Sequence, residues 1–245
     1  MRRQKVGKVQ RKKRGARGVA GGRGGLVESR GMSRFAFVTL LTAVRAPLVF
    51  AGAALALVHL FAPHPAWLAG ALALMGLSAV TDLFDGALAR RWGVTSRLGA
   101  LADPLMDKVF YLVATPVATF AALYNEDVAH ASVLLALDVA SLFRDQWASF
   151  LRSVGAEFGA DVKASFSGKL RTFLAFPILM AVHLQLGLQS LAMRSPAHEG
   201  AWQPPMAAVY ALEGLLLALV VVSGATYTVR FRPYLRRAAR PAGRA

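Results

Sequence analysis

The chain has 245 residues, of which 56% are hydrophobic and only 17% are charged. Lys and Arg number 29 against 13 Asp and Glu, which gives a formal net charge of +16. This composition excludes an ordinary water-soluble enzyme and indicates a membrane protein with several spans, because its apolar runs of roughly 20 residues are long enough to cross a bilayer. The sequence contains no cysteine, which excludes disulfides, thiolate metal ligands and a cysteine nucleophile.

The positive charge is concentrated at the two ends of the chain. Residues 1–34 hold twelve Lys and Arg and one acid, a net charge of +11, and residues 230–245 hold six Arg, a net charge of +6. The intervening residues 35–229 therefore sum to −1. The segment 1–34 has few large apolar residues, and we expect it to be a disordered basic arm.

Three interpretations of this arm are open. The basic arm and the basic cytoplasmic tail 230–245 are expected to lie against anionic lipid headgroups, since each basic residue near such a surface gains about 1 kcal/mol. Nucleic-acid binding is not expected, because no aromatic side chains interleave with the basic ones. Alternatively, translation starts at Met32 and the residues before it are not part of the protein.

Long apolar runs predict an all-α, polytopic membrane protein with six transmembrane helices in a domain that covers residues 35–229. The predicted spans are 37–62, 66–88, 99–122, 129–151, 170–191 and 206–229. Lys and Arg are concentrated in the loops after the second and fourth spans, whereas the opposite loops hold Asn125, Glu126, Asp127 and a lone Arg194. This bias predicts that both termini and the basic loops are cytoplasmic.

Four aspartates stand at the cytoplasmic ends of the second and third predicted spans. Asp82 and Asp85 are three positions apart and Asp103 and Asp107 are four apart, so each pair shares one face of its helix. An ionised Asp at the centre of a membrane helix costs at least ~2.5 kcal/mol, so such acids usually face a cavity or a partner. Four converging carboxylates favour hard divalent cations such as Mg²⁺ or Mn²⁺. The alternative is an ion-pair network with the nearby cations Arg90, Arg91, Arg97 and Lys108.

Small residues lie between these acids and leave room for a ligand beside the backbone. Residues 82–107 read Asp82-x2-Asp85-Gly86-x2-Ala89-Arg90-x8-Gly99-x3-Asp103-x3-Asp107. At every fixed position this pattern resembles the signature of the CDP-alcohol phosphatidyltransferases. The resemblance extends over residues 35–229 and does not include the two basic ends.

The resemblance implies an enzyme that transfers a group from a CDP-linked lipid to an alcohol and releases CMP. It implies that Asp82, Asp85 and Asp103 hold two divalent cations, while Asp107 is the general base and also contacts the second cation. The CDP group would be contacted by Gly86, Arg90, Ser96 and the stretch Thr39-Leu40-Leu41-Thr42. Thr39 replaces an Asn that often begins this stretch in the family.

The chemistry of these residue types is also consistent with such a reaction. A diphosphate is a poor electrophile while it carries its negative charges, and two cations would neutralise it and stabilise the leaving CMP oxygen. A carboxylate within hydrogen-bond reach can accept the proton of the attacking alcohol. We expect direct displacement, because no residue spacing indicates a covalent relay.

A second group of cations follows near the same face of the membrane. Arg144-Asp145, Arg152 and Ser167-Gly168-Lys169-Leu170-Arg171-Thr172 resemble a stretch of bacterial phosphatidylglycerophosphate synthases, with Asp145 in place of a usual Glu and Ala175 in place of a common Gln. This resemblance implies CDP-diacylglycerol and glycerol 3-phosphate as substrates. Arg144, Arg152, Lys169 and Arg171 would then be ligands of the acceptor phosphate. The resemblance also implies a homodimer in the cell's inner membrane, with its active site facing the cytoplasm.

Other interpretations are open. The same chemistry could use inositol phosphate, serine or phosphatidylglycerol as the acceptor, and the four cations could be ordinary cytoplasmic loop residues. A divalent-cation transporter would need a continuous polar path, whereas the outer halves of the spans are almost entirely apolar. An inactive scaffold is disfavoured because all four aspartates are present. Of the other acids, Asp138 is expected to pair with a neighbour such as Arg144 or to face a subunit contact, and Glu213 to be interfacial.

Overall fold

The computed structural model describes the backbone of residues 23–93, 97–163, 165–200 and 202–240. Some side chains within these helices are also outside the description, namely those of residues 23–35, 38, 82, 83, 85–87, 89, 90 and 97–107. Every secondary-structure element in the described part of the chain is helical, as the sequence predicts.

Six α-helices and one short 3-10 helix follow one another along the chain. They are α1 (Arg23–Phe61), α2 (Pro65–Trp92), α3 (Arg97–Tyr124), α4 (Val128–Glu157), α5 (Phe166–Arg194), η1 (Pro196–His198) and α6 (Met206–Ala238). Each α-helix corresponds to one of the predicted apolar runs. Two of them begin at side-chain caps, because the carboxylate of Asp127 and the hydroxyl of Ser165 accept hydrogen bonds from backbone N–H groups of the first turn.

Two helices extend well beyond their predicted runs and enter the basic terminal segments. α1 begins at Arg23, so residues 23–34 of the expected disordered arm are helical, while residues 1–22 lie outside the described residues. α6 continues to Ala238, so the predicted tail begins within a helix. Once a helix has formed, each added residue costs little, and the α6 extension gains a contact because Phe231 packs in a buried cluster with Leu151 of α4.

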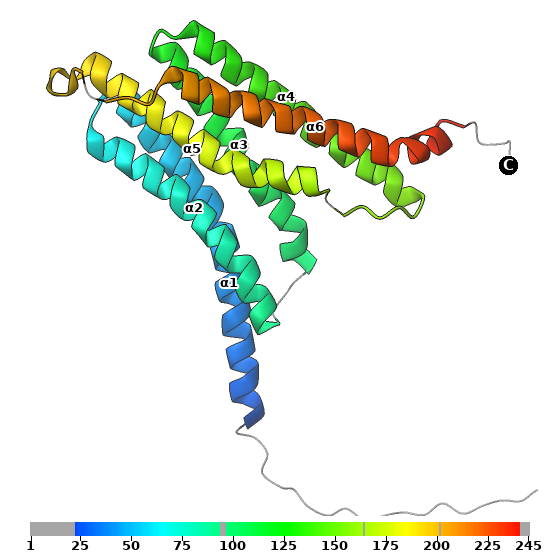
Figure 1. The fold of residues 1–245 in the computed structure, drawn as a ribbon. Helices are drawn as coiled ribbons and strands as arrows, with labels where there is room; N and C mark the ends of the chain where they lie inside the picture. The colour runs from blue at the N-terminus through cyan, green and yellow to red at the C-terminus, as the bar shows by residue number, and fades with distance from the viewer. Residues whose placement is uncertain (1–22, 94–96, 164, 201, 241–245) are drawn as a thin grey trace, which may run out of the picture.

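The helices form a bundle in which α5 joins two groups (Figure 1). α1 packs along α2 and contacts α3, whereas α4 contacts α3 and α6. α5 contacts α1, α2, α3 and α6. Small side chains allow the helices to approach closely, and the buried alanines include Ala53, Ala71, Ala114, Ala118, Ala121, Ala122, Ala131 and Ala175.

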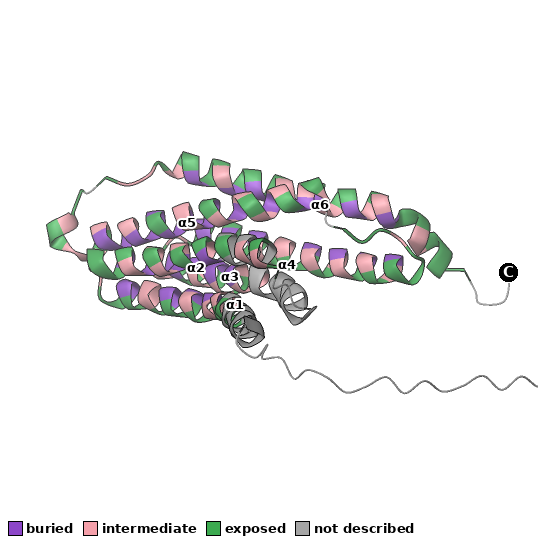
Figure 2. Cartoon of the chain, turned by 90° about the horizontal axis from the view of Figure 1, so that it is seen from below, coloured by how far each residue is buried: buried purple, intermediate pink, exposed green. Residues whose placement is uncertain are grey.

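The helices have the apolar character that a bilayer requires. Within the described residues, three helical stretches are long and apolar enough to cross a membrane: Thr39–Phe61, Phe166–Arg194 and Met206–Ala238. Shorter apolar stretches, Pro65–Thr81 and Lys108–Tyr124, lie in α2 and α3. Large apolar side chains are exposed on all six α-helices, and Figure 2 shows exposed residues on the outer faces and buried ones between helices. An apolar surface this extensive indicates a membrane protein.

Buried polar side chains tie the helices together at the end of the bundle away from the aspartates. Nε2 of His59 on α1 donates to the backbone carbonyl of Gly187 on α5 (3.0 Å). The side-chain amide of Asn125, just after α3, donates to the carbonyl of Leu186 (3.0 Å) and accepts a hydrogen bond from Arg194 (2.6 Å). These bonds satisfy polar groups that are costly to bury alone, and they fix α5 relative to α1 and α3.

Candidate functional site

The four predicted metal ligands lie on two consecutive helices. Asp82 and Asp85 belong to the last turns of α2, and Asp103 and Asp107 to the first turns of α3. α2 ends just before Gly93, whose φ of 64° is the left-handed conformation that commonly follows a helix end. The short connection 93–96 therefore joins the two helix ends that carry the aspartates.

The side chains of these four aspartates and of Arg90 are outside the described residues, and nothing is described of the surroundings of Gly86. Ser96 lies in a segment whose backbone is also outside the description. The metal and CDP contacts expected at these positions therefore stay predictions. Among the side chains that the structure describes, no group of three or more His, Asp or Glu could hold a metal ion.

The expected nucleotide-contacting stretch, Thr39-Leu40-Leu41-Thr42, lies on α1 beside the α2 segment that carries two of the aspartates. Two contacts bracket this region: the Ser78 hydroxyl donates to the backbone carbonyl of Arg45 (3.3 Å), and the rings of Phe37 and Trp92 lie 6.1 Å apart. Because α1 and α2 run in opposite directions, the backbone of residues 39–42 lies alongside that of α2 between these two contacts. The structure thus brings the stretch next to the backbone of the aspartate pattern.

Two of the four expected phosphate ligands meet at one carboxylate. Nη1 of Arg144 on α4 and Nη2 of Arg171 on α5 each donate to Oδ1 of Asp145, at 2.8 Å in both cases. The side chains of Arg144, Asp145 and Arg171 are 10%, 15% and 6% exposed. Two guanidinium groups and one carboxylate leave this buried cluster with a net charge of +1. A bound anion would compensate this charge.

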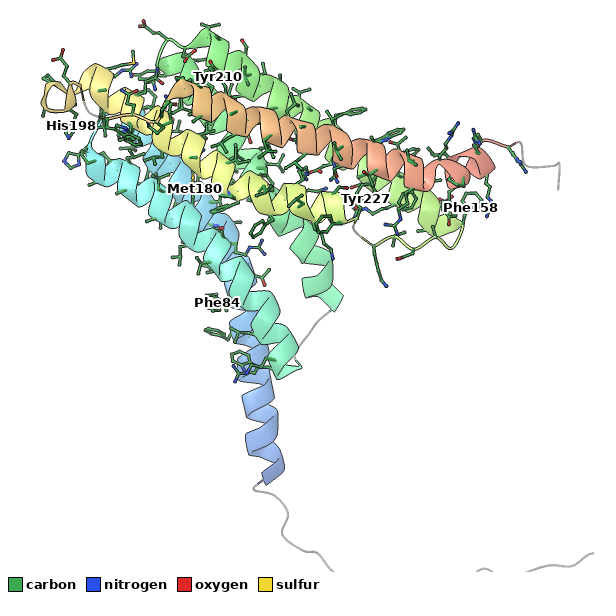
Figure 3. The ribbon with its side chains drawn as sticks, in the orientation of Figure 1. Phe84, Phe158, Met180, His198, Tyr210 and Tyr227 are labelled. Atoms are coloured by element: carbon green, nitrogen blue, oxygen red, sulfur yellow. The ribbon has the colours of Figure 1, made fainter. Side chains whose placement is uncertain are left out.

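Helix α6 holds Arg144 from the other side. Nη2 of Arg144 donates to the hydroxyl of Ser223, and the guanidinium carbon lies 5.0 Å from the ring centroid of Tyr227. The Tyr227 hydroxyl accepts a hydrogen bond from the backbone N–H of Ser165, the N-cap of α5 (3.2 Å). Tyr227, labelled in Figure 3, therefore links α6 both to α4 and to the start of α5.

A cavity of about 60 Å³ lies beside Arg171, between α3, α4, α5 and α6. The polar residues that line it are Lys108, Tyr111, Thr115, Asp138, Ser141, Asp145, Gln146 and Arg171. Nε of Arg171 is buried and has no hydrogen-bond partner in the described part of the chain. Four charged residues line the cavity, the cations Arg171 and Lys108 and the acids Asp138 and Asp145. Lys108 directly follows Asp107 on α3. An anion bound there would lie close to the predicted catalytic region.

The other two expected phosphate ligands are not brought into this cluster. Arg152, two turns beyond Arg144 on α4, hydrogen-bonds within its own helix, to the carbonyl of Ala148 (3.3 Å) and the hydroxyl of Ser149 (3.4 Å). Lys169 is exposed in the first turn of α5. Neither residue lines the cavity.

The structure describes two further acids that the sequence analysis considered. Asp138 does not pair with Arg144, whose acidic partner is Asp145. Asp138 is half-buried, lines the cavity and makes no hydrogen bond to any described residue, and its alternative role at a subunit contact stays a prediction. Glu213 is buried inside the bundle. Its side chain is 1% exposed, and its Oε1 lies 2.7 Å from Nε2 of His130, because the packing of α6 on α4 turns both side chains inward.

Several site residues were not singled out from the sequence as such. Arg45 is 5% exposed and lies three positions after Thr42 on α1, and the signal for it was a lone cation in an apolar run. Ser223 and Tyr227 are four positions apart on α6, a spacing that places both on one face. Their partner on α4 lies about 80 residues away in the chain, so their role required the tertiary structure.

Residues 36–225 match the family model described as CDP-alcohol phosphatidyltransferase. The matched region includes all four aspartates and every described residue of the arginine cluster and the cavity. No solved structure matches the chain.

Three curated relatives illustrate the degree of similarity. A CDP-diacylglycerol–glycerol-3-phosphate 3-phosphatidyltransferase from Cereibacter sphaeroides is 30% identical over 154 residues, which are 63% of this chain and 64% of that protein. The protein of the same name from Escherichia coli is 37% identical over 99 residues, 39% of this chain and 50% of that protein. A probable phosphatidylglycerophosphate synthase from Mycobacterium tuberculosis is 29% identical over 193 residues, 79% of this chain and 78% of that protein. The chain thus spans about half to two thirds of the length of the first two relatives.

Proposed function

Because the chain belongs to the CDP-alcohol phosphatidyltransferase family, we propose that it is an enzyme that transfers the phosphatidyl group of CDP-diacylglycerol to glycerol 3-phosphate and releases CMP. The observation that carries this proposal is the family match over residues 36–225, which contains the complete aspartate pattern. The names of the relatives support glycerol 3-phosphate as the acceptor. The product would be phosphatidylglycerophosphate, so the reaction would belong to phospholipid biosynthesis.

Two divalent cations, Mg²⁺ or Mn²⁺, are proposed to bind at Asp82, Asp85, Asp103 and Asp107. This donor set fits such ions, because carboxylate oxygens are hard ligands and the four residues come from two helices joined by a short connection. When bound, the cations would neutralise the diphosphate and stabilise the departing CMP oxygen.

Asp107 is the proposed general base. Its carboxylate accepts the proton of the acceptor hydroxyl while that oxygen forms a bond to the phosphorus of the phosphatidyl group. The bond between this phosphorus and the CMP oxygen breaks, and CMP leaves. Assistance of this kind contributes roughly 10²–10⁴-fold to the rate.

Arg171 and Lys108 are the proposed ligands of the acceptor phosphate within the cavity. The buried excess charge of the arginine cluster and the unpartnered Nε of Arg171 support an anion there. The cavity of about 60 Å³ has room for more than one water molecule and therefore for a small anionic group beside Arg171. Arg144 of α4, which Ser223 and Tyr227 of α6 hold in place, supports the cluster. Arg152 and Lys169 do not line the cavity, and their expected role as phosphate ligands is not carried into this proposal.

The nucleotide is proposed to bind between α1 and α2. Its proposed contacts are Thr39, Leu40, Leu41, Thr42, Gly86, Arg90 and Ser96. The bracketing contacts of Phe37 with Trp92 and of Ser78 with Arg45 support this placement, since they align the two helices along the aspartate segment.

We propose that the chain crosses the inner membrane six times, with both termini and the active site on the cytoplasmic side. α2 and α3 have 28 residues each and α4 has 30, and helices of this length reach about 42–45 Å, enough to cross the ~30 Å hydrocarbon core. The basic ends would lie against anionic headgroups. The homodimer implied by the family resemblance stays a prediction.

The test is an acceptor screen with the purified protein in mixed micelles that contain CDP-diacylglycerol and Mg²⁺. CMP release is measured with glycerol 3-phosphate, inositol phosphate, serine and phosphatidylglycerol, each offered separately. We expect release with glycerol 3-phosphate, its loss when a chelator removes divalent ions, and its return when Mg²⁺ or Mn²⁺ is added back. Release with serine and none with glycerol 3-phosphate would overturn the acceptor assignment.

A further inference from the structure

The environments of the two arginines that share Asp145 are unequal. Arg144 is held by Asp145, by the Ser223 hydroxyl and by the face of the Tyr227 ring. Arg171 lines the cavity. Among the described residues, its guanidinium group makes a single hydrogen bond, to Asp145. Without this bond, Arg171 would have several staggered rotamers available.

We propose that Asp145 is a positioning residue for the acceptor alcohol. Its Oδ1, 2.8 Å from Nη2 of Arg171, fixes the guanidinium beside the cavity, where it can bind the anion. Arg144 in turn anchors Asp145, because its own position is set by two residues of α6. This inference rests on the proposed function, since it assigns a role within the acceptor site.

Two possible roles of Asp145, reducing the local positive charge and positioning Arg171, predict opposite changes in acceptor affinity when its carboxylate is removed. The variant Asp145→Asn raises the net charge of the buried cluster from +1 to +2. If Asp145 only reduced the local positive charge, this variant would bind an anionic acceptor more tightly. If Asp145 positions Arg171, the variant binds the acceptor more weakly although the site has become more positive, because a neutral amide oxygen loses the ionic attraction that holds both guanidinium groups at one atom.

The experiment compares Asp145→Asn and Asp145→Glu with the wild-type enzyme in the CMP-release assay. The KM values for glycerol 3-phosphate and CDP-diacylglycerol are measured, together with the inhibition constant of inorganic phosphate as a probe of the anion site. Asp145→Asn is expected to raise the acceptor KM and the phosphate inhibition constant about 10- to 100-fold, the size expected for losing a hydrogen bond between charged groups. The KM for CDP-diacylglycerol should change less than about twofold, and Asp145→Glu should restore most of the acceptor affinity.

Asp161→Asn is the matched control. Asp161 is 62% exposed and lies 3.5 Å from Arg230, so this variant makes the same chemical change at a surface ion pair. All three constants should stay at their wild-type values, because exposed pairs contribute little.

The outcomes separate this inference from the proposed function. A wild-type enzyme that releases no CMP with glycerol 3-phosphate refutes the function and the inference together. An active wild type whose Asp145→Asn variant has an unchanged or lower acceptor KM, or equal increases in both KM values, refutes the positioning role alone. If Asp145→Asn does not fold, Asp145→Gln against Asp145→Glu makes the same comparison, because these two side chains have nearly the same shape and differ in charge.

Discussion

The buried pair of His130 and Glu213 gives a prediction whose size follows from its geometry. Oε1 of Glu213 lies 2.7 Å from Nε2 of His130, and the two side chains are 1% and 0% exposed. Replacing Glu213 by Leu leaves the imidazole buried without its partner. Such a loss costs about 1–3 kcal/mol for a neutral imidazole and about 3–5 kcal/mol for a charged one. Glu213→Gln keeps an oxygen acceptor, so we expect a loss below about 1 kcal/mol.

Thermal unfolding in detergent, followed by tryptophan fluorescence, measures this effect, since the chain has four tryptophans. At about 2–4 °C per kcal/mol for a chain of this size, Glu213→Leu should lower Tm by about 6–12 °C if the loss is about 3 kcal/mol. The double variant His130→Leu with Glu213→Leu should recover much of the loss, because removing both partners leaves no polar group unpaired. Glu157→Leu, at the exposed end of α4, is the control and should leave Tm nearly unchanged.

A Glu213→Leu variant within about 1 °C of wild type would refute this reasoning. So would a double variant no more stable than Glu213→Leu, since the cost would then not come from an unpartnered group.

Three further predictions concern catalysis and packing. Asp107→Asn should abolish CMP release while equilibrium binding of CDP-diacylglycerol is largely kept; near-normal rates would remove its role as base. Arg171→Ala should raise the acceptor KM more than about tenfold. Arg152→Ala should raise it less than about threefold, because the Arg152 side chain bonds within its own helix. Equal effects of the two variants would contradict the assignment of the acceptor phosphate to the cavity. Gly155→Ala should destabilise the fold by about 1–3 kcal/mol, because the new Cβ would lie 2.3 Å from the buried ring of Phe231. Gly76→Ala is the control, because a Cβ there meets nothing within 4 Å and should not destabilise the fold. Tm is measured for both variants, and equal Tm values would contradict the prediction.

The helices could be predicted well at their centres and poorly at their ends. The apolar runs placed all six α-helices, because a helix that crosses a bilayer requires about 20 predominantly apolar residues. The C-terminal end of α6 could not be predicted from the apolar runs. Its last turns are rich in arginine, and their helical state depends on the packing of Phe231 with Leu151, a contact between distant parts of the sequence.

In the candidate site, too, features set by local spacing could be predicted, whereas contacts between distant parts of the sequence could not. The aspartate pattern depends on spacing within two neighbouring helices, so it can be predicted from the sequence alone, and the convergence of its side chains stays a prediction. The roles of Arg144 and Arg171 depend on Asp145 and on α6, and the spacing of residues in the sequence contains no information on which cation meets which partner. The pairing of Glu213 with His130 was missed for the same reason, since 83 positions separate them.

Tyr227 of α6 contacts both α4 and the segment that begins α5. Its ring lies against Arg144, and its hydroxyl receives the backbone N–H of Ser165. Exchange of this tyrosine for phenylalanine would keep the first contact and lose the second, whereas exchange for leucine would lose both. In the divergence of related sequences, residues 144, 223 and 227 are therefore expected to be inherited as a set. Position 165 is constrained separately, because its main chain bonds to Tyr227 while its hydroxyl caps the start of α5.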